Sequence, residues 1–457
     1  MPHGELEVIV LAAGQGSRMR SSLPKVLHEL AGRPLLDHVL AAARELQPKC
    51  MHLVVGHGAD RVREAFTAPD VTFHQQAEQL GTGHAVRCAL PGCSMTSLVL
   101  VLFGDVPLIT PESLQKLVSA AAANPAMLAT ECDDPTGYGR VVTDESGAFV
   151  AVVEDKDASD NERRITRVNT GVLAMAAEQL DRLLAKVGND NAQGEYYLPD
   201  VLALARDEGL PVSVVQAQDV VEAQGVNDRI QLERLERVYQ ERVAKRLLAS
   251  GVAVQDRQRI DVRGELSCGK DVLIDVNTVF EGRVVLAEGV RVGANCVLRD
   301  VEVGPDTDIQ PFCHIEGATI GAGCRLGPYA RLRPGTVLEE AARVGNFVET
   351  KNTRLGEGSK ANHLAYLGDA QVGAGSNIGA GTITCNYDGV NKHPTTLGDG
   401  VFVGSNATLV APLSLADDSF VAAGSVLTEG VEAGALAVGR ARQRNISGWR
   451  RPGNKEG

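Results

Sequence analysis

Aliphatic residues recur at every sixth position along the C-terminal half of this chain. One run comprises Leu397, Val403, Leu409, Leu415, Val421 and Leu427, and the same spacing joins Ile320, Leu326, Leu332, Leu338 and Val344. A small residue often follows the aliphatic one, as in Val403-Gly404. Neither an α-helix nor an ordinary strand repeats with this period. The spacing is typical of a parallel β-helix, in which each aliphatic side chain points into a narrow prism and the small residue lets the chain turn.

The repeat begins after Asp261 and is interrupted twice, between Thr350 and Val372 and between Ile378 and Leu397. Because a β-helix tolerates insertions only where loops leave its corners, we expect a loop at each interruption. Both segments are rich in polar residues: Lys351, Asn352, Lys360, Asn362, His363 and Tyr366, then Asn386, Tyr387, Asp388, Lys392 and His393. A site for chemistry in this half is therefore expected in the interruptions.

The N-terminal half has a different pattern, in which short apolar runs alternate with helical ones. Val8–Leu11, Met51–Val55 and Leu98–Phe103 resemble buried parallel strands, and residues 35–46 and 112–123 have helical periodicity. This alternation predicts an α/β domain with a mostly parallel sheet. In such a sheet the loops that follow the strands lie along one edge, where ligands bind.

Charge and cysteine content exclude several classes of function. A net charge of −13 argues against a general surface for nucleic acid or for an anionic membrane. The nine cysteines are scattered without a CxxC pair, which suits a reducing cytoplasm and gives no zinc-binding motif. Glu5 and Glu7 precede the first apolar run, unlike in a signal peptide, and no apolar run approaches the roughly 20 residues of a transmembrane segment. We therefore expect a cytoplasmic protein.

A charged amphipathic segment, residues 227–249, separates the two halves. It has helical spacing without an internal Gly or Pro, and Gly251 follows it as a stop signal. It is either a stiff connecting helix or a helix packed on the first domain. We predict domains at 1–229, 230–250 (the helical linker) and 251–457, the last ending in a basic tail around Trp449.

The first predicted strand leads into a glycine-containing turn with basic residues. Gly14 and Gly16 let backbone N–H groups approach a phosphate, and Arg18 and Lys25 add positive charge. The turn lacks the third glycine of a dinucleotide-binding motif and the Gly-Lys-Ser/Thr of a P-loop. Asp105 follows the strand at 98–103, where a carboxylate can hold a metal ion, although by itself the residue is better interpreted as a helix or turn cap before Pro107.

The segments Leu11-Ala-Ala-Gly-Gln-Gly-Ser-Arg-Met19 and Leu23-Pro-Lys25 resemble the signature of sugar-nucleotide pyrophosphorylases. Further matches follow in order at residues 76–84, 103–107, 134–140, 153–154, 169–171, 193–197 and 225–227. Over nearly the whole chain, the resemblance is to the bacterial bifunctional N-acetylglucosamine-1-phosphate uridyltransferases/glucosamine-1-phosphate acetyltransferases. It implies a Rossmann-like nucleotidyltransferase domain and a left-handed parallel β-helix.

The resemblance implies roles for residues of the N-terminal domain. Asp105 and Asn227 would hold Mg²⁺, while Lys25 and Arg18 would offset the charge of UTP as catalytic groups. The residues implied to contact UTP or the UDP-sugar are Leu11, Ala12, Gly14, Lys25, Gln76, Gly81, Thr82, Phe103, Gly104, Asp105, Gly139, Glu154, Asn169 and Asn227. Members of the family can carry Tyr at position 103.

It also implies a second site in the β-helix. His363 would be the base of acetyl transfer, since a histidine can accept a proton from an attacking amine near neutral pH. Glucosamine 1-phosphate would contact Arg333, Lys351, Tyr366 and Asn377, and acetyl-CoA would contact Ala380, Asn386, Tyr387, Ser405, Ala423 and Arg440. Without the resemblance, Asn377, Ser405 and Ala423 would be interpreted as structural positions of a coil.

The implied function is a two-step synthesis of UDP-N-acetylglucosamine. The chain would acetylate glucosamine 1-phosphate with acetyl-CoA and then transfer UMP from UTP to N-acetylglucosamine 1-phosphate, releasing pyrophosphate. The family implies a homotrimer with acetyltransferase sites at subunit boundaries. The alternatives are a pyrophosphorylase with one activity and a structural β-helix, or a non-catalytic scaffold.

Overall fold

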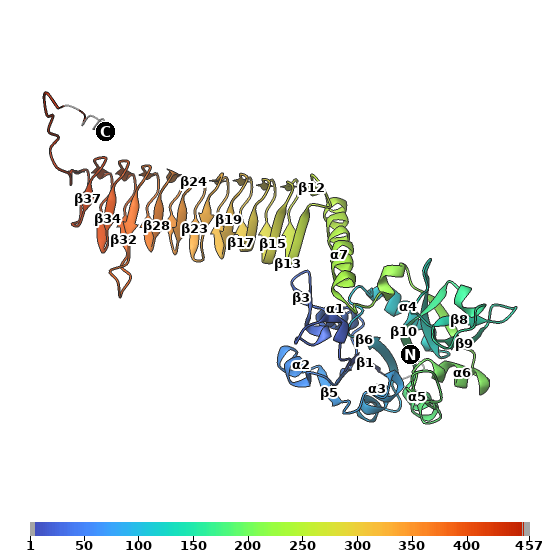
Figure 1. Ribbon diagram of the computed structural model, residues 1–457. Coiled ribbons are helices and arrows are strands. Elements are labelled where there is room, and N and C mark those ends of the chain that lie inside the picture. The colour runs from blue at the N-terminus through green and yellow to red at the C-terminus, as the bar shows by residue number, and fades with distance from the viewer. Residues whose placement is uncertain (1–4, 450, 452–457) are drawn as a thin grey trace, which may run out of the picture. The chain divides into compact units, whose positions relative to one another are not determined.

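The computed structural model describes residues 5–449 and 451. The chain forms two compact units that meet in sequence between Tyr239 and Gln240 (Figure 1). The first unit is a sheet covered by helices, and the second is built almost entirely of short strands. Among the described residues, no helix combines the length and the apolar character needed to cross a bilayer.

One sheet organises the first unit, with strand order β11-β7-β10-β6-β1-β4-β5. Its strands are β1 Leu6–Ala12, β4 Cys50–Val55, β5 Val71–Gln75, β6 Leu98–Phe103, β7 Ala126–Glu131, β10 Arg167–Ala176 and β11 Ser213–Gln216, with β8 Arg140–Thr143 and β9 Phe149–Val153 extending it beside β10. β1 is parallel to both β4 and β6, as predicted, whereas β10 runs antiparallel to β6 and β7.

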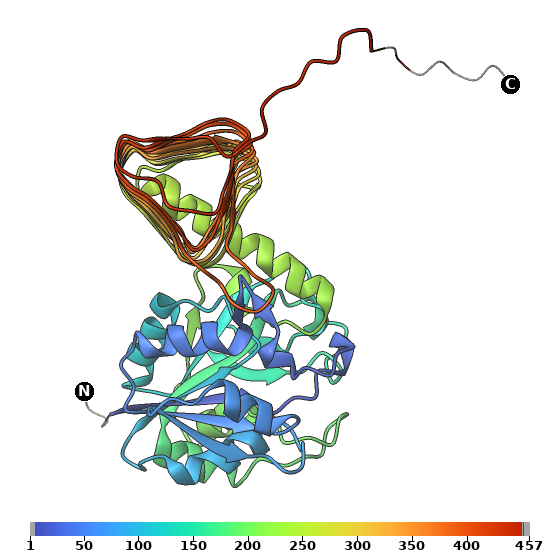
Figure 2. The same ribbon diagram turned by 90° about the vertical axis from the view of Figure 1, so that its left-hand side faces the viewer.

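Helices cover both faces of this sheet (Figure 2). They are α1 Leu35–Arg44, α2 Ala59–Ala65, α3 Thr82–Ala89, α4 Pro111–Ala121, α5 Ala177–Leu184 and α6 Asp200–Asp207. α1, α2 and α4 pack with alternate strand residues such as Val8 and Val10, and α3, α5 and α6 pack with the others, such as Ile9 and Leu11. Burial on both faces explains why these strands are continuous apolar runs in the sequence.

The second unit is a parallel β-helix with three faces, as the six-residue spacing predicts (Figure 2). The first face comprises β12 Ala253–Val254, β14 Leu273–Ile274, β16 Arg291–Val292, β18 Asp308–Ile309, β21 Arg325–Leu326, β24 Arg343–Asn346, β27 Lys360–His363, β30 Asn377–Ile378, β33 Phe402–Val403, β36 Phe420–Val421 and β38 Leu436–Ala437. Arg325 pairs with Arg343, 18 residues on, and Arg343 with Lys360, 17 residues on, so three hexads make one turn.

The other two faces start together in the long strands β13 Ile260–Cys268, β15 Thr278–Leu286 and β17 Val297–Val303, and then separate. The second face continues through β19 His314–Glu316, β22 Arg331–Leu332, β25 Glu349–Lys351, β28 Tyr366–Gly368, β31 Ile383–Cys385, β34 Thr408–Val410 and β37 Val426–Leu427. The third continues through β20 Ala318–Ile320, β23 Thr336–Leu338, β26 Arg354–Leu355, β29 Ala370–Val372, β32 Thr395–Leu397 and β35 Leu413–Leu415.

The predicted loop between Thr350 and Val372 is wrong, because the coils continue through it without an insertion. Thr350 and Ala361 occupy inward positions where other coils carry larger aliphatic residues, and both are fully buried. The Thr350 hydroxyl lies 3.0 Å from that of Thr336, so the buried polar groups satisfy each other. A polar or small residue at an inward position resembles an interruption in the sequence although the backbone keeps its register.

The second interruption is a true loop. On the first face Asn377 pairs with Phe402, 25 residues on, whereas the preceding coil takes 17. The extra residues leave the prism between β31 and β32 and form the projection seen at the orange end of the β-helix (Figure 1). Its base is closed by a bridge between Tyr387 and Lys392, and Asp388 contacts His393 across it.

The helix predicted between the halves is α7, Arg229–Ala249. Its N-terminal part contributes Leu235 to a cluster with Met19, Leu30 and Val226 in the first unit. Its C-terminal part belongs to the second unit, where Gln240 exchanges two hydrogen bonds with the backbone of Val262. Gly251, at a φ of +93°, follows its end as a left-handed stop.

Two candidate active sites

The first candidate site is a cavity of about 290 Å³ at the carboxyl ends of β1 and β6. Nine of the residues predicted to bind nucleotide or sugar nucleotide line it: Leu11, Ala12, Gly14, Lys25, Gln76, Gly81, Thr82, Phe103 and Asp105. Leu11 and Phe103 are paired across the two strands, and the Gly104 N–H donates to the Leu11 carbonyl at 2.9 Å. Adjacent strand ends therefore bring together residues that are about 90 positions apart.

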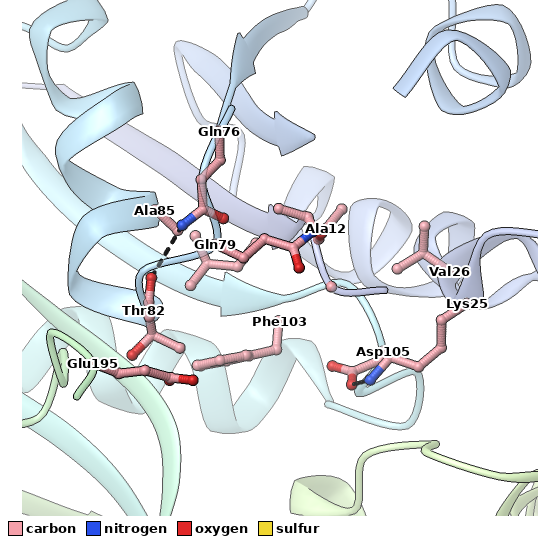
Figure 3. A pocket seen from close by; sticks show the side chains of 14 residues that line it. Ala12, Lys25, Val26, Gln76, Gln79, Thr82, Ala85, Phe103, Asp105 and Glu195 are labelled. Carbon is pink, nitrogen blue, oxygen red and sulfur yellow. Dashed lines mark hydrogen bonds and ion pairs between the residues drawn. The ribbon is translucent and has the colours of Figure 1, made fainter. Parts of the chain in front are cut away.

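Lys25 and the two predicted metal ligands meet at one end of this cavity. The Lys25 ammonium contacts the carboxylate of Asp105 (Figure 3). It also lies 3.3 Å from Asn227 Oδ1. A carboxylate and an amide oxygen that converge on one cation are the hard donors that Mg²⁺ and similar ions take. The residues present therefore fit a divalent cation at this position, where the lysine ammonium now stands between the two oxygens.

Local hydrogen bonds hold Asn227 in place. The Val226 N–H donates to the carbonyl of Asp105 at 2.9 Å, which joins the two segments. Asp228 accepts from the Gln231 N–H at 2.8 Å, and the Gln231 side chain accepts from the Asn227 N–H at 2.7 Å. This reciprocal arrangement resembles a capping box at the start of α7. The sequence that begins the helix thus also positions the site residue.

The other end of the cavity is lined by Gln76 and Thr82 (Figure 3). Gln76 is buried, and its amide donates to the carbonyl of Gly81 at 3.1 Å. Gly81 has a φ of +105° and packs on Tyr196, where a Cβ would come 2.7 Å from the carbonyl oxygen. A side chain at position 81 would therefore displace the turn that forms this wall.

Three predicted sugar contacts, Gly139, Glu154 and Asn169, lie outside the cavity lining but close to one another. The Asn169 N–H donates to the Gly139 carbonyl at 2.8 Å, and Glu154 lies beside Gly139. The Asn169 side chain accepts a hydrogen bond from the Gly171 N–H at 2.9 Å, and Gly171 packs against the Phe103 ring. Asn169 is thereby connected to the cavity lining. Burial, assisted by the nearby carboxylates of Asp200, Asp157 and Asp155, raises the pKa of Glu154.

Three further predicted residues do not line the cavity: Gly104 and Asn227, which contact the lining residues Leu11 and Lys25, and Arg18. Arg18 lies in the turn Ser17–Met19 with an exposed side chain. Conversely, sequence reasoning missed five lining residues: Ala13, Val26, Gln79, Ala85 and Glu195. Gln79 could have been found from its place in the matched segment 76–84, and its amide donates to the Ala13 carbonyl at 2.9 Å. Ala13 and Val26 carry no chemical signal of their own.

The second candidate site is a groove of about 440 Å³ on the first face of the β-helix. It collects predicted residues from successive coils: His363, Asn377, Ala380, Ser405 and Ala423. Asn346, one coil before His363, lies with its side-chain oxygen 2.8 Å from His363 Nδ1. This contact fixes the imidazole through one nitrogen and leaves Nε2 for chemistry. Phe402 and Phe420, stacked with ring centroids 4.5 Å apart, form an apolar wall.

The remaining predicted residues gather at a different corner. Arg333 donates to Glu349 at 3.0 Å, and Lys351 ends the neighbouring strand β25. Tyr366 and Asn386 both lie beside Gly368, where a Cβ would come within 2.5 and 2.8 Å of their polar atoms. None of these four predicted residues lines the groove that contains His363, although Tyr366 begins β28 only three residues after that histidine.

A second ammonium group accompanies Lys351. Lys392 comes from the projecting loop, and its contact with Lys351, together with the repulsion between the two charges, lowers the pKa of Lys351. Two ammonium groups with Arg333 nearby make a concentrated positive charge in an otherwise acidic protein, which suits a phosphate group. Tyr387 and Arg440 are exposed in the loop and in the C-terminal segment, respectively, outside the groove.

Comparisons with known proteins find a matching family model in each half of the chain. A family model described as a MobA-like NTP transferase domain matches residues 8–252, and the model for the hexapeptide repeat of succinyl-transferase matches residues 394–429. A solved nucleotidyl transferase from Methanothermobacter thermautotroptrophicus superposes on 51% of this chain and 97% of its own, with 18% identity and a TM-score of 0.37.

Curated relatives match over nearly the whole chain. The bifunctional protein GlmU of Pseudomonas putida strain F1 is 55% identical over 448 residues, which cover 98% of this chain and 98% of that protein. GlmU of Stutzerimonas stutzeri strain A1501 is 55% identical over 451 residues, covering 98% and 100%. The chain therefore belongs to the GlmU family of bifunctional enzymes and combines a uridyltransferase of the nucleotidyltransferase class with a hexapeptide-repeat acetyltransferase.

Proposed function

We propose that the N-terminal cavity transfers UMP from UTP to N-acetylglucosamine 1-phosphate. The observation that carries this assignment is the convergence of Asp105, Asn227 and Lys25 at the end of a cavity whose other end is lined by Gln76 and Thr82. A base would be recognised at the amide end and the triphosphate held at the charged end. The group formed by Gly139, Glu154 and Asn169 would take the sugar beyond Phe103.

Mg²⁺ held by Asp105 and Asn227 would neutralise charge on the phosphates during the transfer. Attack by a sugar-phosphate oxygen on the α-phosphorus needs no protein nucleophile, so the side chains position reactants and balance charge. A cation held by these two oxygens would take the place of the Lys25 ammonium, which would then be free to contact a phosphate. The exposed Arg18, on a short turn beside Gly14 and Gly16, would reach the leaving pyrophosphate.

For the second activity we propose that His363 accepts the proton of the attacking amine of glucosamine 1-phosphate. Asn346 would hold the ring, and Nε2 would face the substrate. As the amine nitrogen bonds to the thioester carbon, the carbonyl oxygen gains negative charge, which the backbone N–H of Ala380 would stabilise. The thiolate of CoA leaves when the tetrahedral intermediate collapses, and the apolar wall of Phe402 and Phe420 flanks the groove where acetyl-CoA would lie.

Phosphate binding would fall to the other corner, where Arg333, Lys351 and Lys392 concentrate positive charge. Because none of the predicted residues at this corner lines the His363 groove, we propose that a complete acetyltransferase site forms between copies of a homotrimer. Tyr387 of the loop and Arg440 would then complete the acetyl-CoA site at a subunit boundary. We further propose that the enzyme works in the cytoplasm and supplies a precursor of bacterial cell-wall polymers.

The direct test measures both activities of the full-length His363→Ala variant. CoA thiol release from acetyl-CoA and glucosamine 1-phosphate should fall by at least about 100-fold, whereas pyrophosphate release from UTP and N-acetylglucosamine 1-phosphate should be unchanged. Replacing the exposed His314 of β19 by Ala is the matched control and should change neither. Loss of both activities would assign His363 a structural role, and no thiol release by the unmodified enzyme would favour a single-activity pyrophosphorylase.

The shared site has its own test, in which two impaired variants are mixed and assayed at a glucosamine 1-phosphate concentration low enough that neither shows activity by itself. His363→Ala and Lys351→Ala chains are unfolded together, refolded, and assayed for CoA thiol release. If each site combines residues of two copies, mixed trimers regain part of the activity because some boundaries carry neither substitution. If every site lies within one chain, the mixture stays inactive and the proposal is wrong.

A further inference from the structure

A buried group of metal-ligand side chains lies at the edge of the sheet opposite to the nucleotide cavity. Glu7 is near the start of β1, His52 lies in β4, and Cys93 follows the short 3-10 helix Leu90–Gly92. Their exposed fractions are only 4%, 2% and 7%. Neither proposed activity uses these residues, since the cavity lies at the carboxyl ends of the same strands.

The three side chains are close enough to share one ion. One potential ligand atom from each lies within 4.8 Å of the other two, and His52 Nε2 is 3.2 Å from Glu7 Oε2. Ligands bound at about 2.0–2.3 Å in a tetrahedral zinc site are separated by roughly 3.3–3.8 Å. The longest separation, at most 4.8 Å, would therefore have to shorten by about 1 Å to reach that geometry.

Hydrogen-bond partners orient the side chains of this group, as the partners of metal ligands do in known metal sites. His52 Nδ1 lies 3.0 Å from His74 Nε2, and the Ser94 N–H lies 3.3 and 3.2 Å from the two oxygens of Glu7. If His52 Nε2 binds a metal ion, its Nδ1–H donates to His74, and such a contact normally fixes a metal-bound imidazole. His74 is partly exposed on β5, which places the group beneath an accessible edge of the sheet.

Gly92 allows the segment that carries Cys93 to approach both imidazoles. A Cβ at this position would come 2.7 Å from His74 Cε1 and 3.3 Å from His52 Nδ1. Any larger residue would push the cysteine away from the histidines. The close packing brings a thiol, an imidazole and a carboxylate together from three separate segments.

Charge also favours a cation in this place. Glu7 is a buried carboxylate, and its ion-pair partner among the described residues is the imidazole of His52. Burying a carboxylate without a compensating positive charge is costly, and a bound divalent cation would supply that charge.

We propose that Glu7, His52 and Cys93 bind Zn²⁺ or a similar thiophilic divalent cation, at a site distinct from Asp105 and Asn227. Thiolate and imidazole ligands select zinc-like ions, whereas Mg²⁺ prefers oxygen alone. Binding displaces the thiol proton of Cys93 to solvent and forms a sulfur–metal bond, which ties β1, β4 and the Leu90–Gly92 segment together. No local spacing reveals the site, because its ligands lie at positions 7, 52 and 93.

The test uses Co²⁺ as an optical probe on chelator-treated full-length protein, with Mg²⁺ in excess to occupy the Asp105 site. One equivalent of Co²⁺ should produce a sulfur-to-cobalt charge-transfer band, which Zn²⁺ should then abolish. Cys93→Ser should lose the band. Cys88→Ser is the matched control, because Cys88 also lies near a histidine, 4.0 Å from His84 Nε2, and it should keep the band.

Two further measurements keep the proposal open to refutation if Cys93→Ser does not fold. Zn²⁺, but not Mg²⁺, should raise the Tm of the unmodified protein, and His74→Ala should weaken zinc binding by about 10–100-fold. Absence of a charge-transfer band in the unmodified protein would overturn the proposal. Equal zinc retention by the unmodified and Cys93→Ser proteins would do so as well, since the ion would then occupy another site.

Discussion

The two candidate sites differ in how the fold gathers their residues. In the first unit, neighbouring parallel strands end at one edge, so Leu11, Phe103 and Asp105 meet in one cavity of one chain. In the β-helix, successive coils stack the same position along a face, so His363 lies beside Asn346 and Asn377 lies beside Lys360. Stacking along this face adds neither Arg333 nor Lys351 to the groove. A doubly wound sheet can therefore complete a pocket alone, whereas a β-helix groove gains residues from another corner most simply by pairing with a second copy.

The two candidate sites also differ in how their charges are arranged. The nucleotide cavity already balances its charges, because Lys25 contacts both Asp105 and Asn227. The corner with Lys351 and Lys392 instead holds like charges together, and their repulsion lowers the pKa of Lys351. In the nucleotide cavity, a metal ion can therefore replace the lysine ammonium. The corner with Lys351 and Lys392 instead favours the binding of an anion.

The largest expected effect is the loss of one activity while the other stays unchanged. Asp105→Ala should reduce pyrophosphate release by at least about 100-fold at any ordinary Mg²⁺ concentration, because a divalent ion loses its carboxylate ligand. CoA thiol release should not change. Asp60→Ala removes a fully exposed carboxylate and should leave both activities intact. A fully active Asp105→Ala enzyme would show that this carboxylate does not hold the ion.

Lys351→Ala tests the anion corner. The KM for glucosamine 1-phosphate should rise about 10–100-fold, since a charged hydrogen bond contributes roughly 1.5–3 kcal/mol. The KM for acetyl-CoA and the rate of uridylyl transfer should stay the same. Lys270→Ala, at an exposed lysine near the start of the β-helix, is the control. An equal rise in both KM values would indicate a general distortion of the coil instead of a lost phosphate contact.

Thr350→Val examines the interior position that resembled an interruption. The change keeps the shape but removes the hydroxyl bonded to Thr336, which should cost about 0.5–1.5 kcal/mol in denaturant unfolding. Leu355→Ala, at a neighbouring inward position of equal burial, should cost roughly 2–5 kcal/mol. If Thr350→Val raised the free energy of unfolding, burying the two hydroxyls would cost more than their hydrogen bond contributes.

The smallest expected effect concerns Glu154. Its pKa is raised in the folded protein, so the ionised carboxylate lowers stability at pH 7, and this cost disappears below the ordinary value of 4.5, where folded and unfolded states are both protonated. Glu154→Gln should therefore raise Tm at pH 7 by about 1–4 °C, with a smaller gain as the pH falls toward 4.5. The same variant should bind the sugar nucleotide more weakly. A Tm gain that is independent of pH would point to packing instead of charge.

Both folds could be predicted from the sequence because each has its own hydrophobic period. β1, β4 and β6 are continuous apolar runs since both faces of the sheet are covered, and the hexads report the inward positions of the coils. The error at Thr350 and Ala361 has the same origin, because periodicity detects side chains and not the backbone register. Motif resemblance supplied candidate residues, and the structure determined which of them are neighbours.

The sequence by itself determined the two architectures, the order of the motifs and the chemical types at each position. Only the tertiary structure decided that Lys25 stands between Asp105 and Asn227, that His363 is held by Asn346, and that Arg18 lies outside the cavity. It also brought Glu7, His52 and Cys93 together. The physical reason is that periodicity records which side of an element faces the core, whereas contacts between distant segments depend on strand order and coil register, which no local pattern encodes.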